Sequence, residues 1–251
     1  MDEGWEWFCK ISMVIMAVLL LNSIIGDLQF RAMYSFPQVS ATAKTAINPH
    51  NDPVQINLKK TEFFPASGEK KKFILEKQAK YSISGLTVAT NTNFFLRDVL
   101  RSDFDDLFLM DIGLTWGDLA DKSIVKKYFN FKSKKTLGSA RTLYPNPKGC
   151  YLNTVCYASS GSYKNFSYLQ NHFSHTHLTP ASANVMKALL TIKKWDVVRL
   201  DGYLVDVYND KSEVIAKTSL SRDDTNATSR GYGACEVMYV TRVQIGDKVY
   251  K

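Results

Sequence analysis

The first pattern along the chain is an apolar run near the amino terminus. Residues 11–25 (ISMVIMAVLLLNSII) carry no charge, and the run extends to 7–25 with Lys10 as its one charged residue. About 20 such residues form a helix that crosses the hydrocarbon core of a bilayer. Trp5 and Trp7 stand where aromatic residues line a membrane interface, and the Lys10 amine can reach that interface. The pattern predicts a single-pass membrane anchor over residues 1–26.

Two other interpretations of this run are open. A cleaved signal peptide fits the length, but Asp2, Glu3 and Glu6 precede the run, and no small-x-small cleavage site directly follows it. A buried core helix fits less well, because the run has no polar face. The length of the span favours an uncleaved anchor.

The pattern changes after the anchor. Residues 27–57 are polar, contain three prolines and keep no regular period, which predicts a linker. Residues 58–251 are expected to form one globular domain that is well ordered over about 81–247. Residues 58–80 are rich in lysine and glutamate, and they predict a solvated strand pair or a short helix.

Hydrophobic periods divide the middle of the chain into elements. β-branched and aromatic residues from Tyr81 predict a strand, 94–109 predicts a short helix, and 112–117 and 151–157 predict further strands.

The clearest helical period begins at Val185, where apolar residues recur at i, i+3, i+4 and i+7. It predicts a helix over 181–193, with Thr179 as N-cap and Pro180 at the first helical position.

The last part of the chain predicts several strands. Residues 197–208 are β-prone, and Gly202 in their middle indicates a bulge or a close backbone approach. Residues 209–212 have the chemistry of a hairpin turn, and strands at 214–220 and 237–245 follow. We therefore expect a β-rich α+β domain with a small curved sheet or barrel, OB-like or SH3-like.

Composition narrows the class of protein. The chain has 251 residues, of which 45% are hydrophobic and 22% are charged, so disorder over the whole length and a collagen-like repeat are excluded. Four cysteines are too few for a small disulfide scaffold.

The net charge of +8 is unevenly distributed. Residues 122–195 hold 12 lysines or arginines and no aspartate or glutamate. One interpretation is a surface for anionic lipid or an anionic envelope polymer; the other is a basic sheet edge that pairs with the acidic segment 98–121 of the same domain. No nucleic-acid-binding motif is present, so nucleic acid is not favoured. The candidate binding residues are Lys126, Lys127, Lys132, Lys134 and Lys135.

Polar residues without an evident packing role gather in three short stretches: NHFSHTH at 171–177, SRDD at 221–224 and GACE at 233–236. Chain separation does not prevent them from meeting in space. The cluster comprises Ser174, His175, His177, Arg222, Asp223, Asp224, Cys235 and Glu236.

Three interpretations of this cluster are open. Cys235 can serve as a nucleophile with a histidine of 172–177 as base and Asp223 or Asp224 as the group that orients it. His175 and His177 can bind a metal with Cys235 or an aspartate, but no C-x-x-C or H-E-x-x-H pattern supports zinc, and no metal or cofactor is predicted. In the third interpretation these groups only satisfy neighbouring backbone and one another.

Several motifs together resemble a group of uncharacterised bacterial membrane-anchored proteins. The resemblance rests on Trp116-Gly117, a cysteine at 150 or 156, SHTHLTP at 174–180, the strand VVRLDGYLVDV, and SRDD…GACE. It covers roughly residues 81–245, and the segment between Arg222 and Cys235 is longer than in that group. The resemblance implies an N-terminal membrane segment followed by one small domain, and it implies no activity.

The cysteines bear on the compartment. A domain that faces an oxidising compartment is expected to hold a disulfide. Cys150 and Cys156 lie about 20 Å apart if their segment is one strand, beyond the roughly 7 Å limit for Cα atoms. We therefore expect Cys235 to pair with Cys150 or Cys156.

Two functions follow from these patterns. The first is a non-catalytic binding or structural module with a basic surface, held in a bacterial inner membrane with its C-terminal domain in the periplasm and open to a protein partner. The second is a hydrolase or transferase that uses Cys235 and a histidine. A Cys235 sulfur within hydrogen-bond reach of a histidine ring would favour the enzyme.

Overall fold

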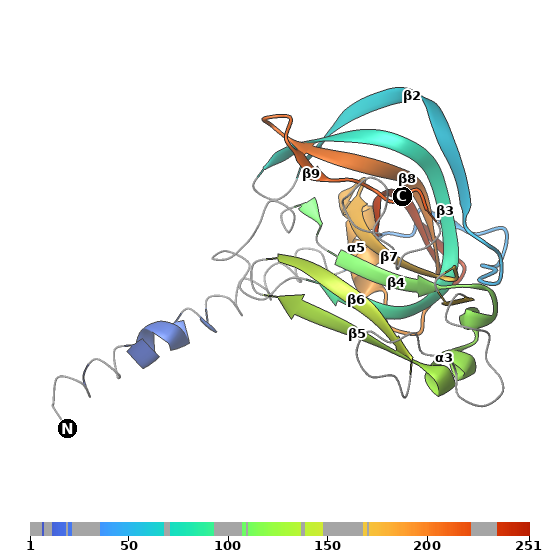
Figure 1. Ribbon diagram of the computed structural model, residues 1–251, viewed down its shortest axis with the longest axis horizontal. Coiled ribbons are helices and arrows are strands. Elements are labelled where there is room, and N and C mark those ends of the chain that lie inside the picture. Colours follow the sequence, from blue (N-terminus) through green and yellow to red (C-terminus); the bar gives the residue numbers. More distant parts are fainter. Residues whose placement is uncertain are drawn as a thin grey trace.

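The computed structural model describes residues 7, 12–18, 20–21, 36–67, 71–92, 107–108, 110–136, 139–147, 168–169, 171–221 and 235–251. These residues form a β-rich α+β fold, as the hydrophobic pattern predicted, with one large mixed sheet, a two-stranded sheet and short helices (Figure 1). Of the two alternatives predicted, a curved sheet or a barrel, the large sheet is strongly curved and is not a closed barrel.

Nine strands make up the large sheet, in the order β1-β11-β10-β7-β4-β3-β8-β9, with β2 paired to β3 and an additional β10–β8 pairing. Their bounds are β1 Ala41–Thr42, β2 Val54–Ser67, β3 Lys72–Thr92, β4 Met110–Thr115, β7 Phe173–Pro180, β8 Val197–Asn209, β9 Val214–Ala216, β10 Glu236–Ile245 and β11 Lys248–Tyr250. All these pairings are antiparallel except β7 with β10, which is parallel.

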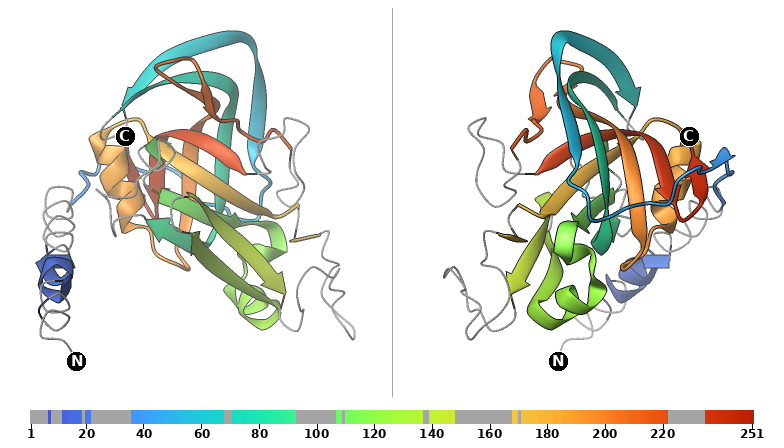
Figure 2. Two further views of the ribbon diagram at one scale, coloured as in Figure 1. Left: turned by 60° about the vertical axis from the view of Figure 1, so that its left-hand side comes forward. Right: turned by 90° about the vertical axis from the view of Figure 1, so that its right-hand side faces the viewer.

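A second, smaller unit stands beside β4 and the last part of β3. It consists of the antiparallel pair β5 (Phe129–Thr136) and β6 (Ser139–Pro147), the 3-10 helix η1 (Gly117–Ala120) and the helix α3 (Lys122–Tyr128) (Figure 2). Asp121 caps α3, because its side chain accepts a hydrogen bond of 2.7 Å from the Ser123 amide.

The main core lies on one face of the curved sheet, where apolar side chains of β3, β4, β7, β8 and β10 meet the helix α5 (Ala183–Thr191). Val185, Ala188 and Leu189 form the buried stripe of α5, as the period predicted. The predicted cap is wrong by three residues. Ser182 is the N-cap, whereas Thr179 and Pro180 close β7.

Several boundaries differ from the expectations. The predicted linker 27–57 includes β1, which pairs with β11, and the start of β2. Within 58–80, residues 58–67 belong to β2 and residues 72–80 to β3, so this part of the chain forms the predicted strand pair and not the alternative helix. Residues 94–106 and 151–157, predicted as a helix and a strand, lie outside the described residues.

Most of the predicted anchor, residues 1–26, also lies outside the described residues. The described part, residues 7, 12–18 and 20–21, is helical and exposed. Within the part of the chain that the structure describes, no helix combines the length and the apolar character needed to span a membrane.

Gly202 is a point of close approach between β8 and β10. The pairing shifts register between Val240 and Arg242, opposite Gly202, so the bulge or close approach expected from the glycine is confirmed. A Cβ atom on residue 202 would lie 2.0 Å from the Tyr239 carbonyl oxygen, which is backbone and cannot rotate away.

We predict that Gly202→Ala lowers the free energy of unfolding by about 2–3 kcal/mol, because β8 and β10 must separate to admit the methyl group. Urea denaturation followed by circular dichroism measures the loss. Gly246→Ala is the matched control, since residue 246 has open space around it and only its φ of +60° opposes alanine. Equal stability of Gly202→Ala and the wild type would contradict the role assigned to this contact.

Candidate functional site

The strand β7 lies between β4 and β10 and carries the two histidines of the predicted cluster. Side chains alternate between the faces of a strand. Leu178 belongs to the main core with α5, so Ser174 and Thr176 face that side, whereas His175 and His177 face the other. The FSHTHLTP segment therefore presents two imidazoles together on one face of the sheet.

The neighbouring strands bring two more functional groups to that face. In the β4–β7 register Asp111 is the partner of His177, and Gly113 is the partner of His175. In the parallel β7–β10 register Glu236 is level with Thr176. Cys235 is one residue earlier and so comes level with His175.

The Cys235 sulfur lies 3.1 Å from Nδ1 of His175, a distance within hydrogen-bond reach for sulfur. The His175 ring is buried, and Cys235 is partly exposed. Cys235 is a thiol in this structure, so the disulfide expected for it is not formed. Its expected partners, Cys150 and Cys156, lie outside the described residues.

The second histidine is held by a buried carboxylate. Nδ1 of His177 lies 2.7 Å from Oδ1 of Asp111, whose side chain is fully buried. A carboxylate oxygen accepts hydrogen bonds, so in this contact Asp111 is the acceptor and Nδ1–H of His177 is the donor. The ring of His177 packs edge-on against that of His175, with centroids 4.7 Å apart, and also contacts Phe108.

Asp111 and Asn91 are members of the site that sequence reasoning missed. Asn91 is the β3 partner of Asp111, so both side chains lie on the histidine face. Asn91 is 4% exposed, and its Nδ2 has no hydrogen-bond partner among the described residues. A signal for Asp111 was present: an acidic residue inside MDIGLT, a strand whose six residues are all buried.

The rest of the predicted polar cluster divides into two groups. Ser174 donates a hydrogen bond of 2.9 Å to Glu236 and lies 2.6 Å from the Thr176 hydroxyl, all on the core face. The Ser174 hydroxyl thus gives the buried Glu236 carboxylate a hydrogen-bond donor, so the role of Ser174 and Glu236 is structural. The other members, Arg222, Asp223 and Asp224, lie outside the described residues, so the proposed orienting role of Asp223 or Asp224 stays a prediction.

His172 does not join the cluster. Its Nδ1 lies 2.8 Å from the Tyr168 carbonyl oxygen, and its ring stacks on the Tyr168 ring at 3.7 Å and tilts against Trp116. Of the three histidines between 172 and 177, His175 and His177 are therefore the two that meet Cys235.

Three of these residues could also hold a metal ion. One ligand atom from each of His175, His177 and Cys235 lies within 4.8 Å of the other two. The bond from His177 to Asp111 is the type that orients a metal-ligating imidazole. The same arrangement also suits proton transfer between the Cys235 thiol and the His175 imidazole. A metal centre and a thiol–imidazole pair differ in the expected distance between sulfur and nitrogen.

The candidate lysines are distributed over two elements. Lys126 and Lys127 are exposed on the last turn of α3. Lys132, Lys134 and Lys135 belong to β5, but their side chains lie outside the described part. Lys122, Lys126 and Lys194 surround the Trp195 ring, with their amines 5.3, 5.7 and 4.8 Å from its centroid.

We predict that Asp111→Ala lowers the free energy of unfolding by about 2 kcal/mol, because it leaves the His177 N–H buried without an acceptor. Asp111→Asn keeps an acceptor oxygen and should cost less. Thermal and urea unfolding measure both, with Asp210→Ala as the control at an exposed turn position. A loss for Asp111→Ala no greater than for the control would show that the contact with His177 contributes nothing.

Comparisons with known proteins add no further constraint. No protein-family model matches the chain, and neither a curated protein nor a solved structure matches it.

Proposed function

We propose that Cys235 and His175 form the thiol–imidazole pair of a hydrolase or acyl transferase. The observation that carries this proposal is the 3.1 Å distance between Cys235 Sγ and His175 Nδ1. A thiol is a weak nucleophile until a base takes its proton, and a histidine in hydrogen-bond contact is the usual base. Cys235 is partly exposed as a residue, which fits a nucleophile that meets its substrate at the surface.

The reaction follows from the chemistry of the pair. His175 takes the thiol proton, and the thiolate attacks an acyl carbonyl carbon to form a C–S bond. The bond from that carbon to the leaving nitrogen or oxygen then breaks, and the leaving group takes the proton from His175. Water, or an acceptor amine or alcohol, gives a proton to His175, attacks the thioester and releases the thiol again.

The His177–Asp111 pair positions and supports this base. The His177 ring packs against His175, and Asp111 brings a carboxylate into the same buried region. A positive charge that develops on His175 during proton transfer is stabilised by a nearby negative charge. His177 and Asp111 are therefore positioning residues in this proposal, and the thiol and His175 are the groups that react.

A metal centre is the competing use of the same residues. With zinc bonds of about 2.3 Å to sulfur and about 2.0 Å to nitrogen, tetrahedral ligand atoms lie roughly 3.5 Å apart. The observed 3.1 Å between sulfur and nitrogen is shorter than this and lies within hydrogen-bond reach for a thiol and an imidazole. The distance favours the reactive pair.

We predict that Cys235 reacts with iodoacetamide at pH 6 nearly as fast as at pH 8, because His175 supplies the thiolate. In His175→Gln the rate at pH 6 should be at least about tenfold lower than in the wild type. Its dependence on pH should then be that of an ordinary thiol, whose pKa is about 8.5. Mass spectrometry of the peptide that contains residue 235 measures the reaction separately from the other cysteines.

Two controls make this test decisive. His50→Gln, an exposed position on another segment, should leave the profile unchanged. An unchanged profile in His175→Gln would contradict the pair. A Cys235 that reacts only after treatment with EDTA would instead support the metal centre.

A second candidate function, the non-catalytic binding module, is favoured by the lysines around Trp195. Their amines lie 5.3, 5.7 and 4.8 Å from the centroid of one indole ring, so three positive charges gather on this face. Trp195 has a φ of 82°, and its amide donates a hydrogen bond of 2.7 Å to the Thr87 carbonyl, while the Thr87 amide donates one of 2.8 Å to the Asp196 carbonyl. These bonds fix the backbone that carries the ring. We propose that this basic face meets an anionic lipid surface or envelope polymer, with the protein at a bacterial inner membrane and the domain in the periplasm.

We predict that replacing Lys122, Lys126 and Lys194 with glutamine makes the protein leave a heparin column at lower salt, because fewer charges hold the polyanion. The matched control replaces the exposed lysines Lys44, Lys211 and Lys248 with glutamine and removes the same net charge. Identical elution of the two triple variants would show that net charge, and not this face, determines retention.

A further inference from the structure

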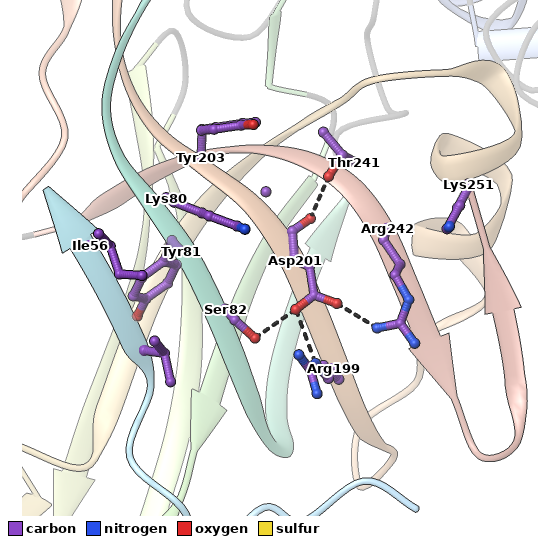
Figure 3. Close-up of a pocket in the computed structure, with 12 residues that line it drawn as sticks. Ile56, Lys80, Tyr81, Ser82, Arg199, Asp201, Tyr203, Thr241, Arg242 and Lys251 are labelled. Carbon is purple, nitrogen blue, oxygen red and sulfur yellow. Dashed lines mark hydrogen bonds and ion pairs between the residues drawn. The ribbon is translucent and has the colours of Figure 1, made fainter. Parts of the chain in front are cut away.

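A second concave site lies away from the Cys235 thiol, on the strands β2, β3, β8 and β10 (Figure 3). Its volume is about 750 Å³, within the range of small-molecule sites. One wall is apolar and belongs to β2, where Val54 and Ile56 are each 58% exposed. The floor is polar and comes from the other three strands. The charged residues that line it are Lys80, Arg199, Asp201, Arg242 and Lys251.

The shape of the site follows from irregular strand pairing. β2 shifts register against β3 between Asn57 and Glu62, just beyond the part that forms the wall. β10 shifts register against β8 between Val240 and Arg242. The second shift turns Arg242 to the same side as Asp201, where the two side chains meet (Figure 3).

Asp201 at the floor is held by three side-chain donors. It accepts hydrogen bonds from the Ser82 hydroxyl at 2.6 Å, from Nε of Arg199 at 3.0 Å and from Nη1 of Arg242. Burial acts to raise the pKa of Asp201, but these three donors outweigh it and hold the pKa below its usual value. Asp201 therefore stays ionised at neutral pH and orders the two arginines.

The lysines of the site are not neutralised by this carboxylate. Among the residues that the structure describes, no carboxylate lies within ion-pair distance of Lys80 or Lys251. Four side-chain cations face one side-chain carboxylate around the cavity, and the terminal carboxylate of Lys251 reduces the excess to two positive charges. Such a concentration of charge around a preformed hollow attracts a ligand with more than one negative charge.

We propose that this pocket binds a small ligand that carries a phosphate or diphosphate group. The arginines, held in place by Asp201, present guanidinium edges that match phosphate oxygens, and Lys80 and Lys251 add charge from two sides. The apolar part of the ligand lies against Val54 and Ile56. The proposal does not depend on the chemistry of Cys235, because no residue is shared between the two sites.

Isothermal titration of the purified full chain with pyrophosphate tests the proposal. Lys80→Gln and Lys251→Gln should each weaken binding about fivefold, the effect of one partly solvated ion pair, and should weaken it together more than singly. Lys248→Gln is the matched control, because it removes the same charge from an exposed position outside the pocket. Circular dichroism checks that the variants are folded.

A second pair of titrations distinguishes a free phosphate compound from a lipid headgroup as the ligand. In one, a free organic phosphate competes with pyrophosphate, and in the other a short-chain phosphatidic acid does. If the pocket recognises only the phosphate group, the two compounds compete equally well. Stronger competition by the phosphatidic acid, reduced by Ile56→Ser, would assign the site to a lipid headgroup. No binding of pyrophosphate to the wild type, or equal weakening by Lys80→Gln and Lys248→Gln, would overturn the proposal.

Discussion

The candidate chemistry of this protein depends on one constraint, the parallel pairing of β7 with β10. A parallel pair cannot be joined by a tight turn and needs a long crossover. Here the crossover passes through α5, β8 and β9 before the chain returns to β10. The register of that pair places the residue before β10, Cys235, level with His175. A shift of one residue would turn the sulfur to the opposite face and separate it from the imidazole.

The strands β4, β7 and β10 have one apolar face, which packs in the core, and one face that carries the polar side chains of the candidate site. On one face β4, β7 and β10 contribute Ile112, Leu178 and Met238 to the core under α5. On the other face β4 carries Asp111 and β7 carries His175 and His177. Cys235, which directly precedes β10, lies level with His175. The apolar face keeps the strands in register, because a slip would expose the whole core. That constraint keeps the side chains of His175, His177 and Asp111 at short distances from their partners.

The sequence predicted the elements where hydrophobic periods were long and undisturbed. The stripe from Val185 gave the helix α5, and the glycine in VVRLDGYLVDV marked the close approach of β8 to β10. Where short-range chemistry was ambiguous, the prediction was wrong. Thr179 and Pro180 suited a helix start, but pairing with β10 extends β7 through both residues and leaves Ser182 to cap the helix. Tertiary hydrogen bonds outweighed the local preference.

For the site, the sequence by itself determined which residue types were available: two histidines spaced to share a face, a cysteine before a strand, and a basic stretch without acids. It also determined that His175 and His177 would point the same way, because strand side chains alternate. Only the tertiary structure decided that Cys235 would meet His175, that Asp111 would hold His177, and that Asp201 would gather two arginines beside Lys80. Arg199 and Asp201 are two residues apart on one strand, but the other hydrogen bonds join residues 41 to 66 positions apart. The partners of these long-range contacts are selected by strand order and register, which no local period encodes.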